Sequence, residues 1–129
     1  MNEKDHPLSV GKRYWLFLPD GRQLGQVSIE RLVDYWAEGS FTPSVTFEDF
    51  RQLFDREARL RRAQIIGVWQ NCADAIEALG IQILGEDGQV HSRMTIFVEG
   101  NEAIIGIYRP GPLPRPAGRH IGIIDKSLL

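Results

Sequence analysis

The middle of the chain carries the pattern that most restricts its fold. From residue 48 to residue 79, apolar side chains return every three or four positions, a spacing that brings them onto one face of an α-helix. They are Phe50, Phe54, Ala58, Ile65, Trp69, Cys72, Ile76 and Leu79. Adjacent arginines interrupt the pattern, and Gly67 weakens a helix by about 1 kcal/mol relative to alanine. The pattern predicts a central helical region over residues 48–80, which is either one long helix kinked near Gly67 or two helices meeting near residues 60–67.

The segment before this region predicts a β-hairpin followed by a helix. Residues 14–18 are aromatic and aliphatic, as strands prefer, and residues 19–22, Pro-Asp-Gly-Arg, are typical of a tight turn. Ser28 is a favourable helix N-cap, and Gly39 fits the position that ends a helix. Between them, apolar residues recur at helical spacing, namely Ile29, Leu32, Val33 and Trp36. We therefore expect a hairpin–helix unit over residues 13–47, with the helix from about Ile29 to Glu38.

The last third of the chain predicts strands and then a proline-rich tail. Residues 81–108 fit an antiparallel β-meander, with strands at 81–84, 90–98 and 103–108 and a hairpin turn at Asp87-Gly88. Residues 109–129 form the tail, in which the four prolines of Pro110–Pro116 favour an extended polyproline II conformation. The expected fold class is α+β in a single domain: an N-terminal β-hairpin plus helix, a long central helix, a C-terminal meander and the tail.

The composition is that of one globular domain. A chain of 129 residues has the length of a single domain, and 43% hydrophobic with 25% charged residues is an ordinary content. The net charge of -2 disfavours a nucleic-acid binder. A single cysteine, Cys72, excludes an intrachain disulfide and a cysteine-rich zinc site. No apolar run is long enough to span a bilayer, and no secretory signal is visible. We expect a cytoplasmic protein with no membrane partner, metal or cofactor.

Residues 14–47 carry a regular succession of aromatic residues and glycines. Tyr14 and Leu16 precede the turn glycine Gly21, the segment 25–27 (Gly-Gln-Val) and Leu32 follow, and Tyr35 stands four residues before the Gly-Ser-Phe of residues 39–41. In this spacing the segment resembles a GYF domain, an adaptor module with a Gly-Pro-Phe segment, a methionine, a tryptophan and a final Gly-Tyr-Phe. Val-Ser at 27–28 and Thr-Pro at 42–43 resemble its divergent bacterial members. The resemblance covers about a quarter of the chain.

The resemblance implies a non-enzymatic protein-interaction module that binds proline-rich or extended peptides on aromatic side chains. At the matching positions these side chains are Tyr14, Tyr35 and Phe41. The sequence departs from the family on this platform, where valine, tyrosine and serine replace phenylalanine, tryptophan and tyrosine. The segment Pro110–Pro116 resembles the ligands that such domains bind, although its order is Pro-Gly-Pro-Leu where those ligands typically have Pro-Pro-Gly followed by an apolar residue. The expected partner is therefore a protein with a proline-rich peptide, or this chain's own tail.

Two other functions stay open. A small-molecule-binding or enzymatic domain would have a pocket between the meander and the central helix, lined by Trp69, Met94, Phe97 and Tyr108. An inhibitor or immunity-type protein would mask a partner through its acidic segments. His91 has no base, nucleophile and orienting group at a recognisable spacing, so no residue receives a catalytic role. A deep apolar pocket with converging polar groups would favour the small-molecule function, and a shallow aromatic groove would favour peptide binding.

The central region also bears on charge and self-association. The arginines at positions 56, 59, 61 and 62 are predicted to form a solvated helix face or to pair with acidic segments, rather than to bind nucleic acid. The apolar seam of Ile65, Trp69, Cys72, Ile76 and Leu79 needs a cover. If the chain's own sheets do not supply it, two copies would pair around it, and we expect a homodimer, the commonest symmetric oligomer.

Overall fold

A computed structural model describes residues 6–107. The chain begins with strands β1 (Arg13–Phe17), β2 (Gln23–Val33) and β3 (Trp36–Pro43). A 3-10 helix, η2 (Val45–Asp49), leads into the helices α1 (Arg51–Arg62) and α2 (Ile66–Ala78). Strands β4 (Gln82–Gly85), β5 (Val90–His91), β6 (Met94–Glu99) and β7 (Glu102–Ile107) complete the described part. The predicted tail, residues 109–129, lies outside the described residues.

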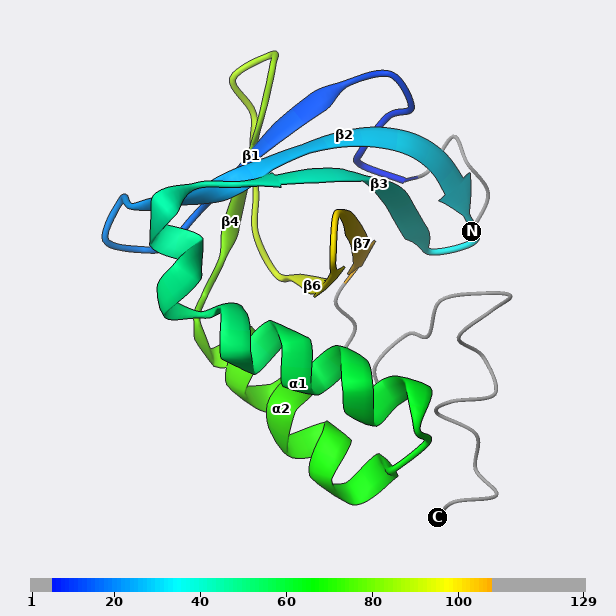
Figure 1. Cartoon of the computed structure of the whole chain (residues 1–129). Helices are drawn as coiled ribbons and strands as arrows, with labels where there is room; N and C mark the ends of the chain where they lie inside the picture. The colour runs from blue at the N-terminus through cyan, green and yellow to red at the C-terminus, as the bar shows by residue number, and fades with distance from the viewer. Residues whose placement is uncertain (1–5, 108–129) are drawn as a thin grey trace.

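All seven strands belong to one antiparallel sheet, in the order β5-β4-β1-β2-β3-β7-β6. Strands β5 and β6 lie at opposite edges, yet only Ser92 and Arg93 separate them in the chain. In a flat sheet the two edge strands would be about 29 Å apart, whereas the three peptide steps from His91 to Met94 span at most about 11 Å. The sheet therefore curls into an incomplete barrel, with both helices on one side of it (Figure 1). The expected α+β fold class is wrong, because residues 6–107 consist mostly of strands in this one sheet and the helices are short.

The predicted hairpin of residues 13–27 is confirmed, but the predicted helix over Ile29–Glu38 is wrong. Tyr14 pairs with Val27, and the turn glycine Gly21 has a φ of +93°. Residues 29–38 instead form the second half of β2, a two-residue turn and the first half of β3, with Val33 opposite Trp36. The N-terminal unit is thus a three-stranded antiparallel sheet rather than a hairpin plus helix.

The helical spacing of the apolar residues between Ile29 and Trp36 results from an irregular strand rather than from a helix. A bulge between Ile29 and Arg31 shifts the register of β2, so the inward-facing residues no longer alternate strictly along the sequence. Gly39 does not end a helix; it lies in β3 beside the main chain of β2. A Cβ atom at Gly39 would lie 2.0 Å from the Ser28 carbonyl oxygen, so only glycine permits this approach of the two strands.

The predicted long central helix, kinked near Gly67, is two separate helices. Gln64, with a φ of +62°, reverses the chain between α1 and α2. The Ile65 N–H bonds to the Leu60 carbonyl at 3.1 Å and the Gln64 N–H to the Arg61 carbonyl at 3.2 Å, which is the Schellman arrangement that ends helices. The alternative of two helices meeting near residues 60–67 is the one observed. Because the left-handed position is occupied by Gln64 rather than by glycine, no residue in the sequence marks this helix end.

The predicted C-terminal meander is also wrong, although its two turns are in place. β4 pairs with β5, and β6 pairs with β7, around the expected turns. The predicted strand 90–98, however, is broken at Ser92 and Arg93, where Arg93 has a φ of +61°. Because of this break, β5 stays on β4 while β6 moves to β7 and the far edge of the sheet.

Two series of contacts between aromatic rings attach the helices to the sheet. Phe97 of β6 stacks on Trp36 at 5.7 Å between ring centroids and contacts Trp69 of α2 at 6.0 Å. In the second series of contacts, the Phe47 ring of η2 lies 5.0 Å from the Phe41 ring of β3 and 5.2 Å from the Phe54 ring of α1, between ring centroids. All six rings are buried. Helix packing against the sheet therefore depends on rings that the sequence spreads from residue 36 to residue 97.

The junction between the helices and the sheet also contains two buried charged residues. Glu57 and Arg61 of α1 are both 0% exposed. The Arg61 Nε donates to Glu57 Oε2 at 2.6 Å, and Trp69 Nε1 donates to the same oxygen at 2.8 Å. The Arg61 guanidinium also lies 5.3 Å from the Phe97 ring centroid. One carboxylate thus joins α1 to α2, and its arginine joins α1 to β6.

The close fit of Trp36 on Gly106 generates the first prediction. A Cβ atom at Gly106 would lie 2.8 Å from the fully buried Trp36 ring, whereas one at Gly67 of α2 would have no atom within 4 Å. We expect Gly106→Ala to lower the free energy of unfolding by about 1–3 kcal/mol through overpacking. Gly67→Ala, the matched control, should raise it by up to about 1 kcal/mol through helix propensity. Urea denaturation measures both; a stabilised Gly106→Ala variant would contradict the described packing.

The second prediction concerns the carboxylate of Glu57. Glu57→Met leaves the Arg61 charge buried without its closest partner, so we expect a loss of about 3–5 kcal/mol in the free energy of unfolding. The double variant Glu57→Met/Arg61→Met removes both charges and should be more stable than Glu57→Met alone. Glu48→Met, which breaks the exposed pair with Arg51, is the control and should change the denaturation midpoint little. A double variant no more stable than the single one would show that the buried pair is not coupled.

Candidate functional site

The strongest candidate site is the place where β4 and β6 diverge. β4 pairs with β5 only at Ile83 and Leu84. After β5 the chain bends at Arg93, and β6 pairs with β7 rather than extending the β4–β5 ladder alongside β4. The gap holds a pocket of about 350 Å³, here called the seam pocket. Its walls come from the last turn of α2, the residues leading into β4, and the start of β6.

The seam pocket is mainly aliphatic. Ile76, Ile81, Met94 and Ile96 line it, and each of these side chains is at least nine-tenths buried. Glu77, Gln82, Ser92 and Arg93 also border it, and all four residues are exposed. Its volume is at the lower end of the range of about 300–1,000 Å³ found for ligand pockets. An aliphatic lining with polar groups at the edge suits a short segment that carries one apolar side chain.

Thr95 gives the pocket an unused hydrogen-bonding group. The residue is 4% exposed, lines the seam pocket, and its Oγ1 has no hydrogen-bond partner within residues 6–107. A buried hydroxyl without a partner costs about 1–3 kcal/mol in proteins. The oxygen itself is almost fully covered, so a ligand would bond to it, and recover part of that free energy, only after the neighbouring side chains shift.

Main-chain groups border the same gap. β6 pairs with β7 along one edge, and every second residue of an antiparallel strand directs its N–H and C=O toward the other edge. Gln82 pairs with Phe17 of β1 on one side, while β5 does not extend far enough to reach it on the other. Strand edges therefore border the pocket on two sides.

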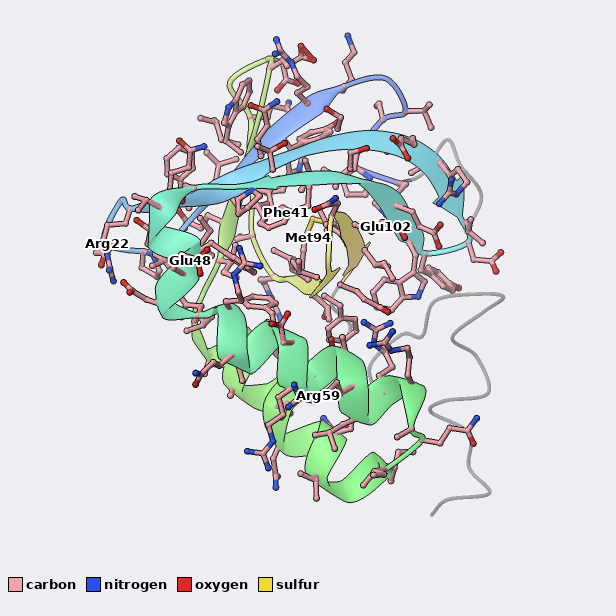
Figure 2. The ribbon with its side chains drawn as sticks, in the orientation of Figure 1. Arg22, Phe41, Glu48, Arg59, Met94 and Glu102 are labelled. Atoms are coloured by element: carbon pink, nitrogen blue, oxygen red, sulfur yellow. The ribbon has the colours of Figure 1, made fainter. Side chains whose placement is uncertain are left out.

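The predicted peptide-binding residues do not come together at a surface. Tyr14 and Phe41 are 5% and 4% exposed and belong to the core. Figure 2 shows Phe41 in the interior together with Met94, whereas Arg22 and Glu48 lie at the periphery. Tyr35, half-buried, lies in the turn between β2 and β3. No shallow aromatic groove is thus formed by these three residues, and their role in peptide binding stays a prediction.

The predicted pocket residues have three different positions. Met94 lines the seam pocket, which does lie between α2 and a C-terminal strand. Trp69 and Phe97 are 2% and 1% exposed and fill the helix–sheet junction. Tyr108 lies outside the described residues. Sequence reasoning missed Thr95, Ile81 and Gln82, because no residue pattern shows where two strands will separate.

The other sequence candidates are structural or exposed. Arg61 is buried on Glu57, so it is not part of a solvated face, whereas Arg56, Arg59 and Arg62 are exposed. Three of the five apolar residues on the predicted helix face, Trp69, Cys72 and Ile76, are buried within the chain, whereas Ile65 is exposed and Leu79 is half-buried. The chain itself thus covers most of this face, and the homodimer stays a prediction. Among residues 6–107 no cluster of His, Cys, Asp and Glu has the arrangement of a metal site.

No protein-family model matches the chain, and no curated protein or solved structure matches it either. The resemblance to GYF domains therefore stays a prediction. In the part of the chain that the structure describes, neither helix has the length and hydrophobicity needed to cross a membrane.

The turn that carries Tyr35 generates the third prediction. The buried His6 places Nε2 3.1 Å from the Tyr35 carbonyl oxygen, and its Nδ1 accepts the Leu8 N–H at 3.1 Å. Both contacts fit a neutral ring, and burial lowers the pKa of His6 below the usual 6.5. The unfolded chain then binds a proton at a higher pH than the folded chain, so stability falls as the pH drops through about 6.5.

We expect the free energy of unfolding, from urea denaturation, to decrease between pH 7.5 and pH 5.5. His6→Gln keeps a hydrogen-bonding side chain but does not titrate in this range, so it should flatten that dependence. His91→Gln, which replaces the half-buried histidine next to Tyr14, is the control and should largely preserve it, because the charge of His91 has the smallest of the effects that set the pKa of His6. The same pH dependence in His6→Gln as in the unchanged protein would contradict the role of His6.

Proposed function

We propose that the chain is a non-enzymatic protein-interaction module that takes a short extended peptide segment into the seam pocket by strand addition. The observation that carries this proposal is the divergence of β4 and β6, which leaves strand edges on two sides of an aliphatic pocket. In strand addition, main-chain hydrogen bonds supply affinity and pockets for alternate side chains supply specificity. The seam offers both kinds of contact within one gap.

The geometry also limits the peptide. A pocket of about 350 Å³ has room for a few residues only. One aliphatic side chain would contact Ile76, Ile81 and Ile96, and a neighbouring main-chain or side-chain group would bond to Thr95 Oγ1. Because proline has no N–H, a proline-rich segment would lose donors needed for pairing. The seam therefore favours an extended aliphatic peptide over a proline-rich one.

A small molecule is the second candidate ligand. The unpartnered hydroxyl of Thr95 beside an aliphatic lining favours it, since such a pocket also suits an apolar compound with one hydrogen-bonding group. The two ligands differ in their use of main-chain N–H groups. A peptide that pairs with β6 needs them, and a compound held by the lining alone does not.

Thr95→Val gives the fourth prediction. Valine keeps the shape of threonine and removes the unpartnered hydroxyl, so we expect the free energy of unfolding to rise by about 1 kcal/mol. The same change should weaken a peptide that bonds to Thr95 by about fivefold, the equivalent of one hydrogen bond. Thr42→Val, at an exposed position of β3, is the matched control and should change neither quantity much.

The peptide is obtained by selection of displayed random hexapeptides on the full chain, and calorimetry measures its affinity. We expect methylation of either set of alternate backbone nitrogens in the selected peptide to weaken binding, because one set of N–H groups faces the edge of β6 and the other faces the edge at Gln82 of β4. Unchanged binding of both methylated forms, together with weakened binding to Thr95→Val, would favour the small-molecule type of recognition. Unchanged affinity for Thr95→Val and for both methylated peptides would exclude the seam as the binding site.

A further inference from the structure

The helical pair carries a second hollow that shares no residue with the seam pocket. It is a groove of about 510 Å³ between α1 and α2. Leu53, half-buried, and Cys72, 6% exposed, form apolar parts of its lining, while Val68 remains 39% exposed and Ala75 is also exposed. Gln52, Arg56 and Asn71 complete the lining. The lining of the groove is thus mixed: four residues supply apolar surface, two amides and one cation supply nearly as much polar surface, and none of the lining residues is a carboxylate.

The arginines of α1 divide into two groups. Arg51 pairs with Glu48, Arg61 with Glu57, and Arg62 with Glu99 at 2.8 Å. Arg56 and Arg59 are exposed and have no ion-pair partner within residues 6–107. Arg56 lines the groove, and Arg59 stands three residues further on, where i and i+3 side chains are neighbours on a helix. Figure 2 labels Arg59 on the helical layer.

The chemistry of a partner follows from this arrangement. A segment that covers Val68 and Ala75 must present apolar side chains, and near Arg56 and Arg59 it must present carboxylates. Two packed helices leave a groove into which the ridges of a third helix fit, and a groove of this kind binds one face of an amphipathic helix. Nucleic acid fits less well, because the lining has no aromatic side chain on which a base could stack.

We propose that the groove between α1 and α2 docks an acidic amphipathic helix of a partner protein. Its apolar face lies on Leu53, Val68 and Ala75, and its carboxylates pair with Arg56 and Arg59. Burial of Val68 removes apolar surface from water, and the two ion pairs set the orientation of the helix rather than most of its affinity. The proposal is independent of the peptide in the seam pocket.

The probe is a pair of labelled 18-residue peptides of identical leucine, alanine and glutamate content. In one peptide the leucines fall on a single helical face, and in the other they are scattered around the helix. Titration of the full chain, followed by fluorescence anisotropy, should give at least about tenfold tighter binding of the amphipathic peptide. Binding should weaken as the salt concentration rises, because the charged contacts are at the surface. Equal binding of the two peptides would overturn the proposal.

Substitutions then locate the site. Arg56→Glu and Arg59→Glu should each weaken the amphipathic peptide severalfold, whereas Lys12→Glu, the same charge change at an exposed position outside the helices, should not. In NMR spectra the side-chain amides of Gln52 and Asn71 should shift on binding. Weakening by Lys12→Glu equal to that of both arginine variants, or no shift of those amides, would overturn the proposal. So would displacement of the peptide by a single-stranded oligonucleotide that binds more tightly, since the groove would then serve phosphates.

Discussion

The buried carboxylate of Glu57 is the contact on which the arrangement of helices and sheet depends. Removing two charges from water costs several kcal/mol per ion, and the pair with Arg61 offsets this only while every hydrogen bond is kept. The bonds reach Trp69 of α2, and Arg61 lies against Phe97 of β6. A rotation of α1 or a shift of α2 would leave the indole N–H of Trp69 without its partner, and a slip of β6 would take the Phe97 ring away from the Arg61 guanidinium. The polar contacts thus fix one register, while the surrounding rings supply most of the buried apolar area.

The second constraint is the short link between the sheet edges. Two residues join β5 to β6, so a sheet of seven strands must curl until its edges meet. Arg93 adopts a positive φ at this link, and the strand changes partner there from β4 to β7. The same bend that allows the sheet to curl also opens the seam pocket. The candidate site is therefore a direct consequence of how the sheet closes rather than an addition to it.

The two surfaces proposed to bind partners differ in kind. The seam presents strand edges and an aliphatic lining with a buried hydroxyl, which suits a short extended segment. The groove between α1 and α2 presents exposed apolar residues beside amides and Arg56, with Arg59 one helical turn further on; neither arginine has an ion-pair partner in the described chain, and this arrangement suits a helix. No residue lines both pockets. A chain with two such surfaces can bring two partners together, in keeping with an interaction module.

Local sequence determined the features that depend on neighbouring residues. Turns at Gly21 and Gly88, the end of the second helix at Gly80, and the helical character of residues 51–78 were all predictable, because a positive φ favours glycine and helical periodicity acts over a few residues. Tertiary structure alone decided the rest. Residues 29–38 have the spacing of a helix, yet pairing with a neighbouring strand and the approach of the Ser28 carbonyl to Gly39 make them a hairpin. The seam pocket exists only because β4 and β6 separate, and the positions of strands across a sheet depend on contacts between residues far apart in the chain.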